Sequence, residues 1–424
     1  MADPLNSGLP MSLQGVRVLD LSRVLAGPWS TQILGDLGAD VIKVERPRGA
    51  SHSGGDDTRG WGPPFLKDRD GVDTAEAAYY LATNRNKRSV TIDLATAEGQ
   101  DVIRRIANQS DVLVENYKVG DMARYGLDAD RLRSLNPRLI YCSITGYGQS
   151  GPYRARAGYD FAIQGMGGLM SVTGASDREL AADKAGGGPQ KAGVAVADLF
   201  TGMYAATAIL AALRHRDQTG QGQTIDMALL DSQVAMLANL GANYLTTGVA
   251  PKRAGNAHQN IVPYQTFETA DGHMILAVGN DHQFRKFCAV AGCGEVASDA
   301  RFARNADRVR HRDVLVPLLA RIIKAQSRRH WLTALEAAQV PCGPINDLAE
   351  VFADPQVAAR DMTVDLEHPL SGHVKLVASP IRLSDTPVRY RRAPPLLGQH
   401  TREVLLELGL SEADVSALER KKAV

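Results

Sequence analysis

Hydrophobic positions in the first 150 residues alternate between two spacings. Apolar residues recur at helical spacing over 27–37, which Gly38 ends, and over 97–109, which Thr96 precedes as a cap. Short apolar runs of strand character lie before, between and after these segments, at 16–22, 40–46, 88–94, 111–117 and 139–145. Strands that alternate with helices predict an α/β fold, in which a parallel sheet is covered by helices on both faces. Ligands of such sheets bind beyond the carboxyl ends of the strands.

The longest apolar segment runs from Leu199 to Leu213 and is interrupted only by Thr, Gly and Tyr. This pattern predicts a buried helix. Asp198 precedes it directly and would lie at or near the N-cap, where unpaired N–H groups and the helix dipole stabilise negative charge. A carboxylate kept ionised in apolar surroundings can attack an activated acyl group, whereas the simpler alternative makes Asp198 only a helix cap.

The rest of the chain changes character twice. Polar segments at 215–224 and 354–361 mark candidate crossovers between domains. Between them, 262–280 is typical of a hairpin, and 310–326 of an amphipathic helix. After them, 373–380 has strand character, and an S-x-x-D pattern at 411–414 predicts the start of a last helix.

Composition narrows the classes of function. The chain has 424 residues, enough for two domains, and its net charge of +1 gives no reason to expect nucleic acid or a membrane surface as a partner. We find no apolar run of the roughly 18 residues that a membrane span needs. The four cysteines form no C-x-x-C pair, which fits a reduced, cytoplasmic setting, and the ten histidines form no metal motif. The turn after the first strand lacks G-x-G-x-x-G, which disfavours a nicotinamide-dependent oxidoreductase.

Seven segments together resemble the family III CoA-transferases over nearly the whole chain from Leu13: 17–47, 84–94, 114–127, 143–152, 193–216, 340–348 and 394–401. The resemblance implies that Asp198 is the nucleophile, which forms acyl anhydrides and an aspartyl-CoA thioester. It also implies a Rossmann-like large domain formed by 13–224 and 341–424, and a smaller α+β domain formed by 225–340. The family's two ring-shaped subunits interlock, so a homodimer is expected.

The resemblance further implies how CoA, here a substrate and not a tightly bound cofactor, is held. Arg46 and Arg124 match positions that contact its nucleotide part, which suits a guanidinium that pairs with phosphate and stacks on rings. Thr145 stands where formyl-CoA transferases have a lysine. The other CoA-lining positions are Leu25, Ala26, Ile92, Asn116 and Tyr117.

Trp61 and Tyr147 match substrate-pocket positions of oxalate-using relatives, but those relatives have glutamine at the position of Leu25 and a glycine-rich lid at 255–265. Several segments instead look like the succinyl-CoA:glutarate CoA-transferases. This branch implies succinyl-CoA as donor and a dicarboxylate such as glutarate as acceptor. The candidates for binding the distal carboxylate are Arg59, His258 and Asn260.

Two other functions stay open at this point. Racemases of the same fold pair the aspartate with a histidine in an AGHD-like motif, which here is AGYD at 157–160. Tyr159 would be a poor base at neutral pH, since the ordinary pKa of tyrosine is about 10. The other alternative is a CoA-binding protein without activity. For a transferase, we expect backbone N–H groups around Leu199 and in the loop 255–260 to stabilise the oxyanion intermediates.

Overall fold

The structure is a computed structural model that describes residues 10–49, 53–176 and 187–424. Its internal contacts divide the chain into two units. The first consists of 1–168, 192–242 and 358–424, and the second of 169–191 and 243–357. The predicted domain boundaries differ from this division at 169–191, 225–242 and 341–357. Residues 225–242 belong to the first unit, because the strand at 224–228 pairs within its sheet.

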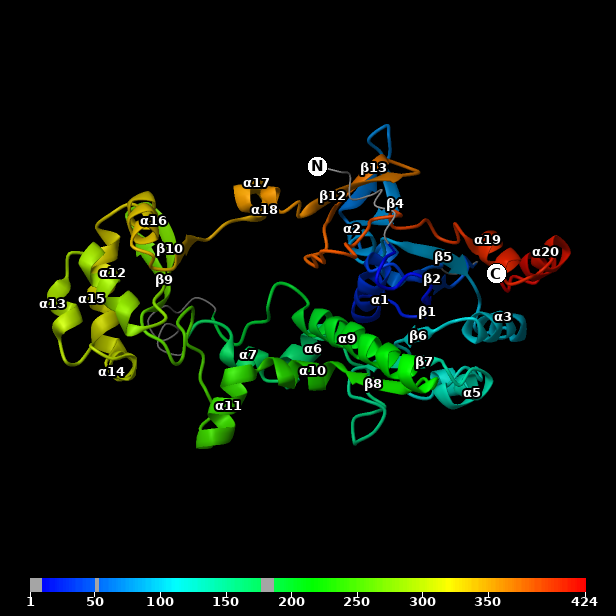
Figure 1. Cartoon of the computed structure of the whole chain (residues 1–424), viewed down its shortest axis with the longest axis horizontal. Coiled ribbons are helices and arrows are strands. Elements are labelled where there is room, and N and C mark those ends of the chain that lie inside the picture. The colour runs from blue at the N-terminus through cyan, green and yellow to red at the C-terminus, as the bar shows by residue number, and fades with distance from the viewer. Residues whose placement is uncertain (1–9, 50–52, 177–186) are drawn as a thin grey trace. The chain divides into compact units, whose positions relative to one another are not determined.

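A six-stranded sheet in the order β5-β2-β1-β6-β7-β8 forms the centre of the first unit (Figure 1). Its strands are β1 (Arg17–Asp20), β2 (Asp40–Glu45), β5 (Lys87–Thr91), β6 (Val112–Glu115), β7 (Ile140–Thr145) and β8 (Thr224–Ala228). All neighbouring pairs run parallel. The α/β class and the five predicted strands are therefore confirmed, and each strand is slightly shorter than its apolar run.

Helices cover both faces of this sheet, as the alternation of strands and helices predicted. Successive strand residues point to opposite faces, so Val18 and Leu19 belong to different hydrophobic clusters. One cluster packs against α3 (Ala97–Asn108), α5 (Ala129–Leu135), α19 (Thr401–Glu407) and α20 (Glu412–Arg420). The other packs against α1 (Ala26–Asp36), α9 (Val196–Thr219) and α10 (Leu229–Met236). The predicted caps at Thr96 and Ser411 are also confirmed.

Helix α9 corrects one expectation from the sequence. Its most apolar 18 residues have a mean hydropathy of 1.6, so by length and composition α9 could cross a membrane. A core helix meets the same criteria. Ala205, Ile209 and Ala212 are buried in the cluster that contains strand residues Val114 and Ile144, so α9 is a core helix of the first unit.

Short elements complete the first unit and join it to the second along the chain. They are η2 (Asp57–Gly60), α2 (Ala78–Leu81), α4 (Asp121–Arg124), α6 (Asp160–Met166), α11 (Ala238–Thr247), α18 (Pro355–Ala359) and the hairpins β3 (Phe65–Lys67)–β4 (Asp73–Ala77) and β12 (Thr363–His368)–β13 (Gly372–Val377). Strand β13 confirms the strand predicted at 373–380.

The second unit has its own hydrophobic core around an antiparallel sheet in the order β11-β10-β9. Its strands are β9 (Tyr264–Thr269), β10 (Gly272–Ala277) and β11 (Cys342–Pro344), and the first two form the hairpin predicted at 262–280. Its helices are α7 (Leu169–Val172), α12 (Asp281–Val290), α13 (Gly294–Ser298), α14 (Asn305–Arg310), α15 (Arg312–Lys324), α16 (Arg328–Ala337) and α17 (Leu348–Ala353).

Candidate active site

Asp198 lies in the first turn of α9, as its third residue, and is not the N-cap itself. The cap position is held by Ala195, whose side chain cannot accept a hydrogen bond. Asp160 takes over this role from the first turn of α6. Its Oδ1 accepts hydrogen bonds from the N–H groups of Ala197 and Asp198, at 2.8 and 3.3 Å. Because Asp160 satisfies these N–H groups, the carboxylate of Asp198 does not fold back to cap its own helix.

The environment of Asp198 opposes its ionisation. Burial raises the pKa of its carboxyl group to about 7, and the negative charge of Asp160 adds to this effect. The N–H groups that cap a helix normally favour a carboxylate in the first turn, but here Asp160 occupies them. Asp198 is therefore poorly solvated and weakly stabilised as an anion, which makes it a reactive oxygen nucleophile once deprotonated.

The start of α1 lies beside the start of α9 because α9 has a glycine at the crossing. A Cβ on Gly202 would lie 2.5 Å from the carbonyl oxygen of Ala26. The side chain at the N-cap of α1, Leu25, makes no capping hydrogen bond. Within the described residues, the N–H groups of Leu25 and Ala26 have no hydrogen-bond partner. The expectation for Leu199 is wrong, because its N–H group donates to Ala195 within the helix at 3.1 Å.

A pocket of about 290 Å³ opens at the carboxyl ends of β1, β6 and β7 and contains Asp198. Of the residues predicted to contact CoA, this pocket brings together Leu25, Ala26, Asn116, Tyr117 and Thr145. A second pocket, of about 260 Å³, shares Arg23 and Tyr117 with the first and contains the predicted residues Arg46 and Ile92. The two pockets are therefore adjacent, and together they hold seven of the eight predicted CoA positions.

Arg124 lines neither pocket. Its side chain is 73% exposed and pairs with Asp121 at 3.0 Å, while its guanidinium lies 5.9 Å from the ring centroid of Tyr125. Asp121 lines the first pocket and Tyr125 the second, so Arg124 lies at their margin.

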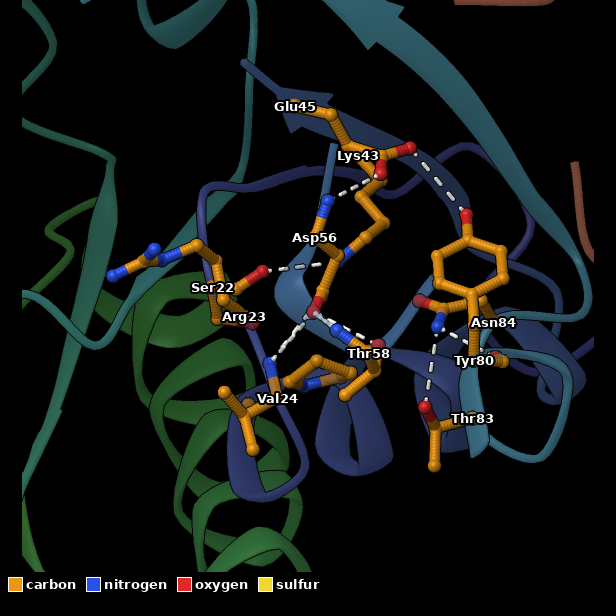
Figure 2. A network of polar contacts seen from close by, with 12 residues as sticks. Ser22, Arg23, Val24, Lys43, Glu45, Asp56, Thr58, Tyr80, Thr83 and Asn84 are labelled. Atoms are coloured by element: carbon orange, nitrogen blue, oxygen red, sulfur yellow. Dashed lines mark hydrogen bonds and ion pairs between the residues drawn. The ribbon is translucent and has the colours of Figure 1, made fainter. Parts of the chain in front are cut away.

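A strained turn after β1 forms one wall of the first pocket. Val24 has a φ of 71°, which is unusual for a β-branched residue. Its N–H group donates to both carboxylate oxygens of Asp56, at 3.2 and 3.3 Å. Lys43 holds Asp56 at 2.8 Å and also donates to the carbonyl of Ser22 at 3.0 Å (Figure 2). The turn is thus fixed by a fully buried ion pair beneath it.

The electrostatics of this pair favour its charged form. Burial alone would lower the pKa of Lys43, but the carboxylates of Asp56 and Asp20 outweigh it and the pKa is raised. Burial likewise raises the pKa of Asp56, but Lys43 reverses the effect and the pKa is lowered.

Asn116, which follows β6, holds the same turn, since its side chain accepts from the N–H group of Arg23 at 2.9 Å and donates to the carbonyl of Arg23 at 2.7 Å.

The structure places Arg59, a candidate for binding the distal carboxylate, outside the lining of the Asp198 pocket. Its guanidinium is buried and bonded to both carboxylate oxygens of Glu45, each at 2.8 Å, and to Glu76 at 2.6 Å. It also donates to the hydroxyl of Tyr80 and to the carbonyl of Pro395. These contacts tie the chain around η2 to the C-terminal segment, and the two carboxylates balance the charge of Arg59.

Trp61 and Tyr147 are differently placed. Trp61 is 45% exposed and contacts the ring of Tyr79 edge-on, with centroids 5.2 Å apart. Burial raises the pKa of Tyr79 to about 12, and the charge of Asp198 contributes, so Tyr79 lies near the nucleophile candidate. Tyr147 follows β7 on a loop of which Gly146, Arg154 and Arg156 line the pocket, whereas Tyr147 itself does not. Its hydroxyl donates to the sulfur of Met166 at 3.1 Å.

His258 and Asn260 belong to the second unit, and their predicted role stays a prediction. Within that unit, the N–H group of Asn260 donates to Nδ1 of His258 at 3.0 Å. The ring of His258 also contacts Tyr264 edge-on, at 5.3 Å between centroids.

Sequence reasoning missed several pocket residues. Arg23 follows β1, at the strand end where a site was expected, and could have been found from that pattern; its guanidinium pairs with Asp57 at 3.0 Å. Asp160, whose charge acts on Asp198, and Tyr79, on which the charge of Asp198 acts, lie outside the pocket lining on distant segments, which no local pattern shows. The remaining cations of the first pocket are Lys118, Arg154 and Arg156.

In the part of the chain that the structure describes, no group of His, Cys, Asp and Glu could hold a metal ion.

Comparison with known sequences identifies the family of this chain. A model of CoA-transferase family III matches residues 13–401. A succinate–glutarate CoA-transferase of Agrobacterium fabrum is 53% identical over 408 residues, which cover 96% of this chain and 98% of the relative. A succinyl-CoA:glutarate CoA-transferase of Homo sapiens is 43% identical over 396 residues, which cover 93% of this chain and 86% of the relative.

Solved structures agree with the sequence comparison. A CaiB/BaiF family protein from Brucella suis superimposes with a TM-score of 0.80 at 49% identity, and the match covers 94% of this chain and 99% of the other. The protein Rv3272 from Mycobacterium tuberculosis, solved as a D175A mutant, gives a TM-score of 0.80 at 29% identity, covering 93% of this chain and 99% of the other.

Proposed function

The chain belongs to CoA-transferase family III, and we propose that it transfers CoA from succinyl-CoA to glutarate or another C4–C6 dicarboxylate. The relatives from Agrobacterium fabrum and Homo sapiens, which are named for this pair of substrates, support the choice. The observation that carries the proposal is the poorly solvated carboxylate of Asp198 in a pocket that also contains most of the predicted CoA positions.

We propose that Asp198 acts as a covalent nucleophile. Its carboxylate oxygen attacks the thioester carbonyl, the C–S bond breaks, and CoA leaves as a thiolate, which gives a succinyl–aspartyl anhydride. The thiolate then attacks the aspartyl carbonyl and releases succinate, which gives an aspartyl-CoA thioester. The acceptor carboxylate attacks the carbonyl of this thioester, the C–S bond breaks, and CoA leaves again as a thiolate, which gives a second anhydride. The thiolate resolves that anhydride at the acceptor carbonyl, which frees Asp198 and the new acyl-CoA.

Each of these steps passes through an oxyanion that needs hydrogen-bond donors. The N–H groups of Leu25 and Ala26 are suitable because they have no partner among the described residues and lie in the same pocket as Asp198. The strained turn at Val24, held by Asp56, fixes their direction before the substrate binds. Such preorganised donors stabilise the intermediate without reorganisation.

We propose that CoA occupies both adjacent pockets. Leu25, Ala26, Asn116, Tyr117 and Thr145 would line its thiol end, near Asp198. The second pocket, with Arg46 and Ile92, would receive the nucleotide part, and Arg124 would meet a phosphate at the margin. Trp61 and Tyr147 would border the acyl group, and His258 and Asn260 stay candidates for it. A guanidinium suits the phosphates, since its planar fork pairs with two oxygens.

We also propose that the active protein is a homodimer in the cytoplasm. Phe200, Met203 and Tyr204 of α9 are 40%, 53% and 44% exposed, which is unusual on a helix that is otherwise a core element. The four free cysteines fit a reduced compartment. Light scattering on the purified protein tests the dimer.

The nucleophile is tested by Asp198→Asn, which should abolish transfer from succinyl-CoA to glutarate while CoA still binds. Asp231→Asn is the matched control, because Asp231 is also the third residue of its helix, α10, but does not line the pocket. Incubation of the unchanged protein with succinyl-CoA and hydroxylamine should leave a hydroxamate at Asp198, which mass spectrometry detects. Turnover of Asp198→Asn at the rate of the control would refute the proposal.

A further inference from the structure

The proposed dicarboxylate substrate leaves one charge without a protein partner, and the present inference rests on that proposed function. While one carboxyl carbon reacts at Asp198, the distal carboxylate lies in the same pocket and needs a cation. Arg59 does not line this pocket, and Glu45 and Glu76 balance its charge. The described cations of this pocket are Arg23, Lys118, Arg154 and Arg156.

The loop that contains Arg154 and Arg156 is anchored at its base. It leaves β7 at Gly146 and returns at Gly158, and these two glycines meet so closely that a Cβ on Gly146 would lie 2.6 Å from the Cα of Gly158. The N–H group of Gln149 donates to both oxygens of Asp226 on β8, at 3.2 and 3.0 Å. The loop is thus closed at its base and hydrogen-bonded to β8.

Aromatic contacts then fix Arg156 within the loop. Its guanidinium carbon lies 3.9 Å from the ring centroid of Tyr153, which is a stacking distance. Tyr153 in turn contacts Tyr147 edge-on, with centroids 5.7 Å apart. Stacking holds the guanidinium plane but leaves its N–H edge open to hydrogen bonds.

The charge of Arg156 is also uncompensated. Arg23, in the same pocket, is paired with Asp57. Arg156 has no ion-pair partner among the described residues, and its side chain is exposed to the pocket solvent. Arg154 is similarly unpaired but makes no aromatic contact that would orient it. Lys118 follows Tyr117, one of the predicted CoA positions, and its ammonium group is a point charge without a fork.

From these observations we propose that Arg156 binds the distal carboxylate of both the acyl donor and the acceptor, and so restricts the enzyme to dicarboxylates. It lies four residues before Asp160, which holds the start of α9 and thus the nucleophile. The position of Arg156 is therefore tied, through one short segment, to the position of the reacting carboxylate.

The test compares Arg156→Gln with the matched control Arg154→Gln, on the same loop and in the same pocket. Each is assayed with succinyl-CoA as donor and either glutarate or its five-carbon monocarboxylate counterpart, valerate, as acceptor. We expect Arg156→Gln to lower kcat/KM for glutarate by about 10- to 100-fold, the loss of a charge-assisted hydrogen bond. Because the donor is the same in both reactions, the ratio of the glutarate rate to the valerate rate isolates the acceptor site, and this ratio should fall only in Arg156→Gln.

A second measurement separates this role from binding of a CoA phosphate. Titration with CoA alone should give the same Kd for the unchanged protein and for Arg156→Gln. An unchanged acceptor ratio in Arg156→Gln, a weaker Kd for CoA, or a fallen ratio in Arg154→Gln would each overturn the assignment. If the unchanged protein prefers valerate to glutarate, the proposed function fails as well, so the two failures are distinguishable.

Discussion

The charge of Asp160 next to Asp198 gives a prediction about the pH dependence of catalysis. Asp160→Asn removes this charge but keeps an oxygen that can accept from Ala197 and Asp198, so the start of α9 should stay capped. Since a nearby negative charge disfavours the carboxylate, the substitution should lower the pKa of Asp198. Burial, the larger cause, remains, so the pKa should stay above its ordinary value of 3.8.

The size of the effect follows from the pKa of Asp198, which is raised from 3.8 to about 7. This difference corresponds to about 4 kcal/mol against the charged form. With a pKa of about 7, roughly a tenth of the carboxyl groups are ionised at pH 6 and roughly nine tenths at pH 8. Because only the carboxylate attacks the thioester, the rate of the first step should rise about tenfold over this range. In Asp160→Asn the midpoint should move to lower pH by on the order of 1 unit.

The assay is the single-turnover release of CoA from succinyl-CoA between pH 5.5 and 9, which isolates the first chemical step. Thermal unfolding at each pH checks that the protein stays folded. A rate that does not change between pH 6 and 8 would show that Asp198 is already fully ionised, or is not the nucleophile. An identical midpoint in Asp160→Asn would show that Asp160 acts only as a cap.

Three further predictions concern binding and stability. Arg46→Ala should raise KM about tenfold for every acyl-CoA alike, because it removes a phosphate contact and no acyl contact; an effect on one donor alone would contradict this. Lys43→Met should lower the free energy of unfolding in urea by about 3–5 kcal/mol, because it leaves Asp56 as an unpaired buried charge, whereas Lys118→Met on the surface should have little effect. Asp198→Asn should raise the free energy of unfolding above pH 7, by at most about 4 kcal/mol, and should not raise it below pH 4. The reason is that the pKa of Asp198 is raised in the folded state, so the unchanged protein loses stability as the pH rises from 3.8 to about 7. Equal melting temperatures at pH 8 would refute this.

The sequence predicted local features well. The strands of the sheet, the caps at Thr96 and Ser411 and the hairpin at 262–280 follow from short patterns whose causes lie within a few residues. Asp198 was correctly placed at the start of a long helix, but not as its third residue, because the cap comes from Asp160, 38 residues earlier.

The role of Arg59 could not be judged from the sequence for the same reason. Its partners Glu45, Glu76 and Pro395 lie on three separate segments, and only the folded chain shows that they surround its guanidinium. A sequence motif does not distinguish an arginine that binds a ligand from one that pairs with a buried carboxylate. The arginine that the structure favours, Arg156, lies in a loop without periodic pattern.

The order in which the first unit is completed has a consequence for its synthesis on the ribosome. The face of the sheet that contains Leu19 and Ile42 is covered by Val404, Leu405 and other residues near the C-terminus. Ser89, on the edge strand, accepts a hydrogen bond from the N–H group of His400 at 2.9 Å. The last strand of the six-stranded sheet, β8, leaves the ribosome roughly 170 residues before these C-terminal segments. At usual elongation rates this interval lasts on the order of 10 to 30 s. During that time the part of this sheet face that α3 and α5 leave open is uncovered in the nascent chain, so this enzyme should depend on chaperones that bind before translation ends.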